Sequence, residues 1–236
     1  MQTMRMAVSS SSNQTRRAGE FLNKLSPAAL ADFESMQYPT LYPAGMTLFT
    51  EKQVPQGVYV VVSGEVKLSM NSSDGKRLIL RIAKAGELLG LSSVINGDPS
   101  EITAETLHPA RIAVIERDHF LGFLRRHPEA YQTLSVELSR HFNMVCEQLR
   151  TVGLSSSAPE KLARLLLDWS EEGKMTDAGT KFHFPLTHEE IGEFIGASRE
   201  TVTRTLTVFK TRRLIMFNGA TLTIPNRGAL ETYARC

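Results

Sequence analysis

The sequence predicts an α+β chain in which a β-rich domain and a small helical domain are joined by a long helix. Three observations point to that architecture. Short runs of β-forming residues, separated by turn residues, occupy residues 38–116. A seven-residue apolar repeat then covers residues 128–154. Two short helical patterns with a glycine turn between them precede a hairpin signal.

The composition is that of an ordinary globular protein, with 42% hydrophobic and 22% charged residues. The net charge of +2 excludes a polybasic, histone-like protein but allows a local basic face. Cys146 and Cys236 are too few for a disulfide framework or for a four-cysteine zinc or iron–sulfur site. Because no apolar run reaches membrane-spanning length and no leader is visible, we expect a cytoplasmic protein without a membrane partner.

The first domain is expected at residues 20–127, after a polar, serine-rich tail at residues 1–19 that we expect to be disordered. A helical pattern begins at Glu20, and its apolar positions are Phe21, Leu22, Leu25, Leu30 and Phe33. Strands are predicted at residues 47–49, 57–62, 66–70, 77–82 and 111–115. Asp74-Gly75 lies between two of them and predicts a hairpin. These short strands predict a small sandwich or barrel.

One helix is predicted at residues 128–154, with Pro128 in its first turn. It could pack only on its own domain, but a seven-residue repeat of this length favours a coiled-coil seam with a second copy. We therefore predict a homodimer. The repeat and the apolar residues beside it are Tyr131, Leu134, Leu138, Phe142, Val145, Leu149 and Val152.

The second domain is expected at residues 155–236. Ser157 is predicted to cap a helix with Glu160 at its third position, and residues 181–185 are predicted as a short strand. Thr187 and Glu190 predict a capping box at the start of a further helix, which ends at Gly196. A new helix capped by Ser198 then completes a helix-turn-helix.

The last of these helices has two chemically different faces. Val202, Leu206 and Phe209 form its apolar side, and the opposite side carries residue types that read base edges. A solvated surface helix is the alternative, but the preceding helix and turn favour recognition of double-stranded DNA. The DNA-binding candidates, including two basic residues suited to phosphates, are Ser198, Arg199, Glu200, Thr203, Arg204, Lys210 and Arg212.

A hairpin is predicted directly after this helix, with Asn218-Gly219 as a type I′ turn. A hairpin in this place makes a winged helix. The wing could contact the DNA backbone or close the domain core, and we favour the second role.

These residues together resemble the bacterial CRP/FNR family of transcription regulators over about residues 21–228. Residues 191–204 resemble the recognition signature of the family, and Pro43-Ala44-Gly45, Gly64-Glu65-Val66 and residues 86–91 resemble its cyclic-nucleotide-binding-type β-roll. The resemblance implies a β-roll sensor domain, a dimerisation helix and a C-terminal winged helix-turn-helix. It also implies a two-fold symmetric DNA site with TGTGA-like half-sites, read by Arg199, Glu200 and Arg204, and RNA polymerase as a partner.

The effector region departs from the family pattern. The resemblance makes Gly86, Glu87 and Leu88 pocket candidates, but residues 99–103 lack the arginine that pairs with the phosphate of cAMP, and Glu101 adds a negative charge. We therefore expect an effector other than cAMP. Two alternatives stay open, which are an effector-independent dimer and a cAMP-responsive regulator with Arg77 or Arg81 as a substitute cation.

No cofactor, metal site or catalytic residue is expected. A metal-dependent barrel enzyme needs histidines on its strands, and no histidine precedes His108 in the sequence. The histidines of the first domain show no pattern that marks a haem ligand.

Overall fold

The computed structural model describes residues 20–154 and 157–234, and these form two compact units. The first unit holds residues up to Met70 and Ile82–Asn143, and the second holds Asn71–Arg81 and Met144 onward. The expected tail at residues 1–19 and Cys236 lie outside the described residues. Within the described residues, no helix is both long and apolar enough to cross a membrane.

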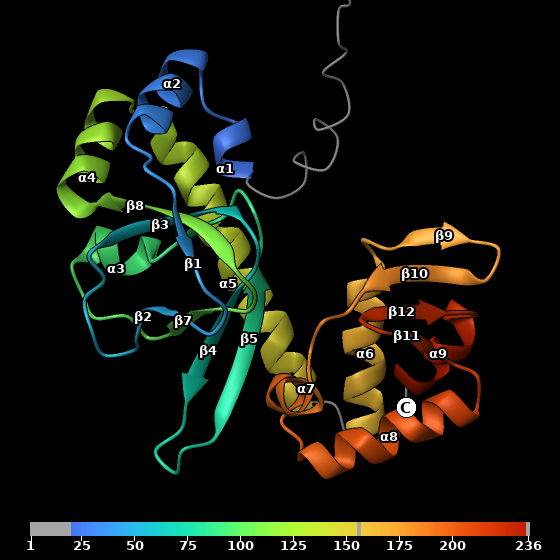
Figure 1. Ribbon diagram of the computed structural model, residues 1–236. Helices are drawn as coiled ribbons and strands as arrows, with labels where there is room; N and C mark the ends of the chain where they lie inside the picture. Colours follow the sequence, from blue (N-terminus) through green and yellow to red (C-terminus); the bar gives the residue numbers. More distant parts are fainter. Residues whose placement is uncertain (1–19, 155–156, 235–236) are drawn as a thin grey trace, which may run out of the picture. The chain divides into compact units, whose positions relative to one another are not determined.

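Two antiparallel four-stranded sheets form the β-roll (Figure 1), in the orders β1-β8-β3-β6 and β2-β7-β4-β5. Pairs such as Tyr59 with Val114 and Leu68 with Ala104 set the register. The strands are β1 (Thr40–Tyr42), β2 (Thr47–Phe49), β3 (Gly57–Ser63), β4 (Val66–Asn71), β5 (Arg77–Ala83), β6 (Leu88–Leu89), β7 (Thr103–Thr106) and β8 (Ala110–Glu116).

All five strands predicted for the first domain are present, as β2, β3, β4, β5 and β8. The sequence did not reveal β1, β6 and β7, which have two to four residues each and are too short to show a period. The predicted hairpin turn is also present, with Gly75 at φ +82° and its N–H donating to Ser72 O at 3.0 Å.

The first helical pattern was predicted as one helix, and this is wrong. It is divided into α1 (Glu20–Asn23) and α2 (Pro27–Ser35). Ser26 caps α2 by accepting a hydrogen bond from Ala29 N at 3.2 Å, and Pro27 occupies the first turn. A capped start with proline begins a new helix rather than continuing an old one.

The apolar positions of α1 and α2 nevertheless lie in the core. Phe33 contacts Phe21 and Phe123 with ring centroids 5.6 and 5.2 Å apart. Phe123 belongs to α4 (Arg117–Arg126), which lies beside α2 at one end of the β-roll (Figure 1). A short helix, α3 (Leu91–Asn96), contacts α4 and β3.

The long helix is present as α5 (Ala130–Leu154). Pro128 lies just before it rather than within it, and its carbonyl accepts from Tyr131 N at 3.2 Å. The prediction of a continuous helix is confirmed, with its start shifted by two residues.

The second unit is a helical domain with one antiparallel sheet of order β11-β12-β10-β9. Ser157 caps α6 as predicted, accepting from Glu160 N at 3.3 Å. The elements are α6 (Ala158–Ser170), β9 (Lys174–Thr176), β10 (Gly179–His183), α7 (His188–Ile195), α8 (Arg199–Thr211), β11 (Met216–Asn218), β12 (Thr221–Ile224) and α9 (Arg227–Ala234).

The wing hairpin forms where it was predicted, but its turn differs by one residue. Asn218 pairs with Thr221 as the last residues of the two strands, so the turn is Gly219-Ala220. Gly219 has φ +59° and Ala220 is not among the residues with positive φ, which fits a type II′ turn rather than the predicted type I′ turn. Leu222 and Ile224 are buried, so the wing closes the core as expected.

Candidate DNA-binding surface and effector region

Local interactions fix the helix-turn-helix at the start of α7 and at the turn between α7 and α8. Glu190 N donates to Thr187 Oγ1 at 3.2 Å and Thr187 N donates to Glu190 Oε2 at 3.0 Å, which is the predicted capping box. Gly196 ends α7 at φ +64°. Gly192 permits the tight turn, because a Cβ there would lie 2.6 Å from Ala197 O. These features place α8 directly against α7.

The apolar side of α8 is buried as predicted, with Val202, Leu206 and Phe209 at most 1% exposed. The opposite side is exposed along the whole helix. It presents the predicted base-reading residues Arg199, Glu200, Thr203 and Arg204, with Thr207 beside them. The structure therefore brings the predicted base-reading residues onto one face.

Three of the predicted residues also form hydrogen bonds within α8 or at its start. Ser198 Oγ accepts from Thr201 N at 3.2 Å and so serves as the N-cap of α8. Thr203 Oγ1 donates to Arg199 O at 2.9 Å. Arg204 Nη2 donates to Thr201 Oγ1 at 3.3 Å, so its guanidinium rests along its own helix in the DNA-free protein.

Glu200 is ionised at neutral pH. Hydrogen bonds from its own backbone N–H and from the Ser198 side chain lower the pKa of the Glu200 carboxyl, and the positive charges of Arg199 and Arg204 act in the same direction. An ionised carboxylate only accepts hydrogen bonds, so on a recognition helix it selects a base that offers a donor.

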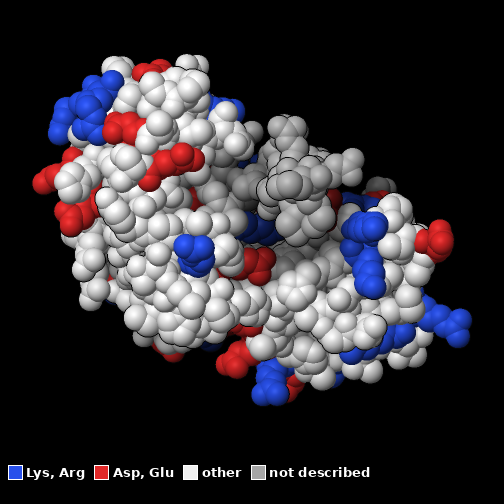
Figure 2. Space-filling view, turned by 45° about the horizontal axis from the view of Figure 1, so that its top comes forward, with Lys and Arg blue, Asp and Glu red and all other residues white. Residues whose placement is uncertain are grey.

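The two predicted phosphate contacts lie at the end of α8, where aromatic rings support them. Lys210 Nζ lies 4.7 Å from the centroid of the Phe217 ring in the wing. Arg212 donates to the hydroxyl of Tyr233 on α9 and lies over its ring. Both residues remain exposed. Figure 2 shows Lys, Arg, Asp and Glu scattered over one largely uncharged face of the molecule.

His188 is a residue of this surface that the sequence did not single out. It is the first residue of α7, and its Nδ1 lies 2.8 Å from Thr203 Oγ1 on α8. A histidine at the start of an otherwise acidic helix gave no signal of this contact, because the two residues are 15 positions apart.

The candidate effector residues have different environments. Gly86 forms a turn at φ +89° and donates to Val61 O at 2.6 Å, and Leu88 is fully buried in the core. Glu87 is only 5% exposed, and its Oε1 accepts from Lys84 N at 3.0 Å. Of the three, Glu87 alone carries a functional group.

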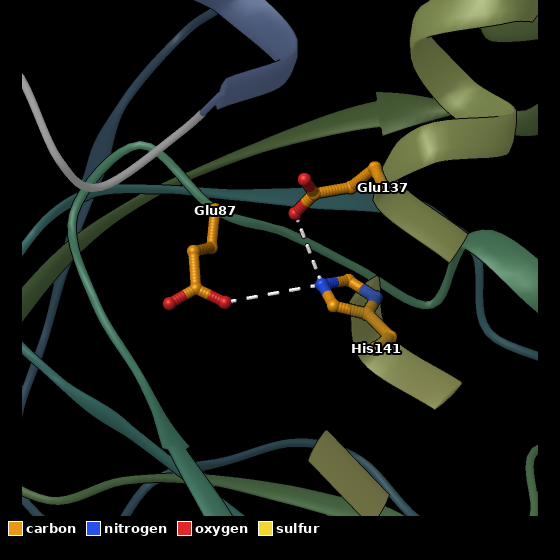
Figure 3. Close-up of side chains that lie close together, drawn as sticks. All are labelled: Glu87, Glu137 and His141. Atoms are coloured by element: carbon orange, nitrogen blue, oxygen red, sulfur yellow. Dashed lines mark ion pairs between the residues drawn. The ribbon is translucent and has the colours of Figure 1, made fainter. Parts of the chain in front are cut away.

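Glu87 belongs to a cluster of charged side chains with α5 (Figure 3). His141 Nε2 lies 3.0 Å from Glu137 Oε1 and 3.9 Å from Glu87 Oε2. Arg140 Nη2 lies 2.7 Å from Glu137 Oε1 and 3.3 Å from Glu87 Oε2. Burial raises the pKa of Glu137, but hydrogen bonds from His141 and Arg140 outweigh it and lower that pKa to about 2. The sequence did not reveal this cluster.

Two carboxylates and one imidazole form a donor set that suits divalent transition metals. The ligand atoms of Glu87, Glu137 and His141 lie within 4.8 Å of one another. However, Arg140 donates to the same two oxygens that a metal would need. A cation would have to displace this guanidinium, so the arrangement is a closed ion-pair cluster rather than an open metal site.

Residues 99–103 form the segment in which the family pattern has a phosphate-binding cation, and here the Ser100 side chain bonds to the backbone of the same segment. Ser100 is 4% exposed, and its Oγ donates to Ile102 O at 2.8 Å and accepts from Ile102 N at 3.2 Å. Arg77 and Arg81 lie on β5 four residues apart, and Arg81 is 7% exposed. Their residues fall in the second unit and Glu87 falls in the first, so their role as substitute cations stays a prediction.

Of the residues predicted for a dimer seam on α5, all but Leu134 are exposed or partly exposed in the single chain. Phe142, Leu149 and Tyr131 are 69%, 58% and 48% exposed, which is unusual for large apolar side chains. Leu134 is only 3% exposed and packs in the core of the β-roll, so it does not belong to an exposed seam. The other predicted members, Leu138, Val145 and Val152, are partly exposed.

Gln148 on α5 is a further residue that sequence reasoning missed. It is 7% exposed, and its Nε2 donates to Ile79 O on β5 at 2.8 Å and to Phe194 O on α7 at 2.6 Å. The side-chain amide of Gln148 thus connects α5 with β5 and with α7 by hydrogen bonds. It positions the first helix of the helix-turn-helix.

Comparison with known proteins agrees with this architecture. Residues 39–127 match the family description "Cyclic nucleotide-binding domain", and residues 160–233 match "Crp-like helix-turn-helix domain". The chain is 28% identical to the "CRP-like cAMP-activated global transcriptional regulator" of Mycobacterium tuberculosis, over 93% of this chain and 97% of that protein.

Two further similarities concern an activator and a solved structure. The chain is 27% identical to the "Transcriptional activatory protein AadR" of Rhodopseudomonas palustris, covering 82% of this chain and 80% of that protein. It has the fold of FixK2 from Bradyrhizobium japonicum, with a TM-score of 0.74 and 22% identity, covering 84% of this chain and 96% of that chain. This chain, with its β-roll, long helix and exposed recognition helix, belongs to the CRP/FNR family of DNA-binding transcription regulators.

Proposed function

We propose that the chain acts as a homodimer that reads a two-fold symmetric duplex site and responds to an effector other than cAMP. The observation that carries the DNA part is the exposed front of α8, where Arg199, Glu200 and Arg204 stand on one face of a helix capped by Ser198. RNA polymerase is the expected partner at promoters, and the cytoplasm is the expected location of a regulator that works on bacterial DNA.

The chemistry of this face supports base reading. A guanidinium can donate two parallel hydrogen bonds to O6 and N7 of guanine, and the ionised Glu200 can accept from N4 of cytosine. Such pairs suit a TGTGA-like half-site, because its guanines and the cytosines paired with them expose these atoms in the major groove. Lys210 and Arg212 then hold backbone phosphates, which sets the register without reading sequence.

Dimerisation is supported by the exposed apolar residues of α5. Residues of a coiled-coil seam are separated alternately by three and four positions. When Ser135 is included, this spacing is followed by positions 131, 138, 142, 145, 149 and 152. Leu134, which is buried in its own domain, falls outside that spacing. Two recognition helices related by this seam would contact half-sites about one helical turn apart, which is about 34–36 Å.

The proposal of an effector other than cAMP is supported by charge. A cyclic phosphate needs a cation or several N–H donors, and the expected position holds Ser100, whose hydroxyl is used by Ile102. Glu101 beside it is exposed and negative. Glu87, the residue that could accept from a ribose hydroxyl, is bound to Arg140 instead. An effector-independent dimer is the second candidate.

Binding-site selection with the purified full-length protein tests the DNA assignment. Replacing Glu200 with Ala should relax the preference at one base position and cost about 1–3 kcal/mol. Replacing Lys210 with Ala should weaken binding equally on all sequences and reduce its salt dependence. An unaltered selected motif for Glu200→Ala would show that this residue does not read bases.

A DNA-binding titration with and without cAMP tests the effector assignment. We expect no change of affinity at cAMP concentrations up to the order of millimolar, because a ligand shifts DNA binding only through differential affinity. A large gain of affinity that Glu87→Ala abolishes would overturn this proposal. Loss of that gain in Arg81→Ala would identify the substitute cation.

A further inference from the structure

His188 joins α7 to α8 through its ring. Its Nδ1 lies 2.8 Å from Thr203 Oγ1, and the Thr203 hydroxyl donates to Arg199 O at 2.9 Å. When the ring is protonated, both of its nitrogens carry a hydrogen. Nδ1 can then donate to Thr203 Oγ1 while Nε2 offers a second, positively charged donor.

His188 lies at the edge of the proposed DNA surface. In a helix-turn-helix, the recognition helix enters the major groove and the first helix crosses the sugar–phosphate backbone. His188 is the first residue of α7 and is bonded to Thr203, which lies on the exposed front of α8 between Arg199 and Arg204. With α8 docked in the major groove as proposed, this ring would lie where the groove meets the backbone.

Apart from His188, the charged residues of α7 are all acidic, so the helix has no other group that could attract a phosphate. The helix carries Glu189 and Glu190 in its first turn and Glu193 in its second, and it contains no Lys or Arg. Three carboxylates repel phosphates, and His188 is the one residue of α7 that can become positively charged.

We propose that His188 is a phosphate-contacting residue of the DNA surface, which holds Thr203 through Nδ1 and donates from a protonated Nε2 to a backbone phosphate. Binding of each helix-turn-helix to DNA then takes up to one proton from solution. The inference depends on α8 docking in the major groove, and it adds a proton-linked contact to the base contacts proposed above.

The charged groups near His188 belong to α7 and α8. Glu189 and Glu190 follow it on α7, and Glu190 is engaged with Thr187 in the capping box. On α8, Arg199 begins the helix and its carbonyl accepts from Thr203, the contact partner of His188. A DNA phosphate beside the ring would add a negative charge that favours the protonated form.

Calorimetry on the wild-type protein provides the first test. Binding to a duplex with two TGTGA half-sites is measured at about pH 7 in two buffers of different ionisation enthalpy, because imidazole titrates near this pH. The proposal expects uptake of up to one proton per bound helix-turn-helix. Absence of any proton uptake would overturn it without requiring a variant.

Variants provide the second test. Affinity should fall by up to about tenfold per pH unit for each His188 as the pH rises through the range in which imidazole titrates. His188→Gln keeps an N–H donor for Thr203 and should flatten this profile. His188→Lys should bind tightly at every pH. His183→Gln, at an exposed position on β10, is the matched control and should leave the profile unchanged.

Salt dependence separates a phosphate contact from a merely structural role. At about pH 6, the wild-type salt slope should be steeper by about 0.9 for each His188 than at about pH 8, since one more phosphate is neutralised. Because phosphate contacts ignore sequence, the effect should also appear on a duplex without the selected site. If His188→Gln keeps both the wild-type pH profile and the pH-dependent slope, the proposal is wrong, even if Glu200 reads bases as proposed.

Discussion

Replacement of Gln148 with Leu tests how the first helix of the helix-turn-helix is held. Leu nearly conserves the volume of the side chain but has no N–H group, so the carbonyls of Ile79 and Phe194 lose the donor at 2.8 and 2.6 Å. Each buried carbonyl left without a partner costs about 1–3 kcal/mol, so the pair predicts about 2–6 kcal/mol. Partial relaxation towards water favours the lower half of that range.

The fluorescence of Trp169 reports the unfolding of the second unit, to which Gln148, Ile79 and Phe194 belong. Trp169 is the single tryptophan of the chain and packs against Phe184 in the second unit, with ring centroids 4.9 Å apart. For a loss of about 3 kcal/mol and a urea m-value of about 2 kcal/mol per molar, the fluorescence midpoint should fall by roughly 1.5 M.

Gln132→Leu is the matched control, because Gln132 is exposed on the same helix. Its effect should remain within about 0.5 kcal/mol. A midpoint for Gln148→Leu equal to that of the wild type would refute the reasoning, since it would mean that the two carbonyls do not depend on this amide.

The remaining predictions concern assembly and pH. The double variant Phe142→Glu/Leu149→Glu places charges at the two most exposed apolar positions of the proposed seam, and sedimentation should show monomers with weak DNA affinity. Partial burial, followed by repulsion from Glu171 and Glu147, raises the pKa of Asp168 to about 6. Ionisation of Asp168 therefore opposes folding, and this destabilisation develops as the pH rises from about 4 to about 6 and persists above. Because Asp168 is more than one-third exposed, solvent screening limits the effect to about 1 kcal/mol or less, and Asp168→Asn should raise the urea midpoint slightly at neutral pH and not at about pH 3.

Controls distinguish these effects from general damage. Gln132→Glu adds a charge to an exposed position of α5 outside the seam, and it should leave the sedimentation coefficient unchanged. Persistence of the dimer in the double variant would place the interface elsewhere. A stability difference between Asp168→Asn and the wild type that is equally large at about pH 3 and pH 7 would show that charge is not its cause.

Local signals in the sequence were sufficient for most of the fold. The capping residues Ser157, Thr187 and Ser198 and the turn glycines act within a few positions of their own partners, so a window of the sequence contains the whole interaction. The faces of α8 follow from its period alone, so its exposed face, with the proposed base-reading residues, was predicted before the structure was known. The errors were also local. Ser26 caps a second helix where one continuous helix was predicted, and the turn of the wing is Gly219-Ala220 rather than Asn218-Gly219.

Tertiary structure decided the contacts between residues that are far apart in the chain. Arg140 meets Glu87 across 53 positions, Gln148 meets Ile79 across 69, and His188 meets Thr203 across 15. It also decided that Leu134 packs inside its own domain while Phe142 faces outward. A residue pattern records the period of a helix, but the direction of each face depends on which other elements cover it, and this is settled only when the whole chain has packed.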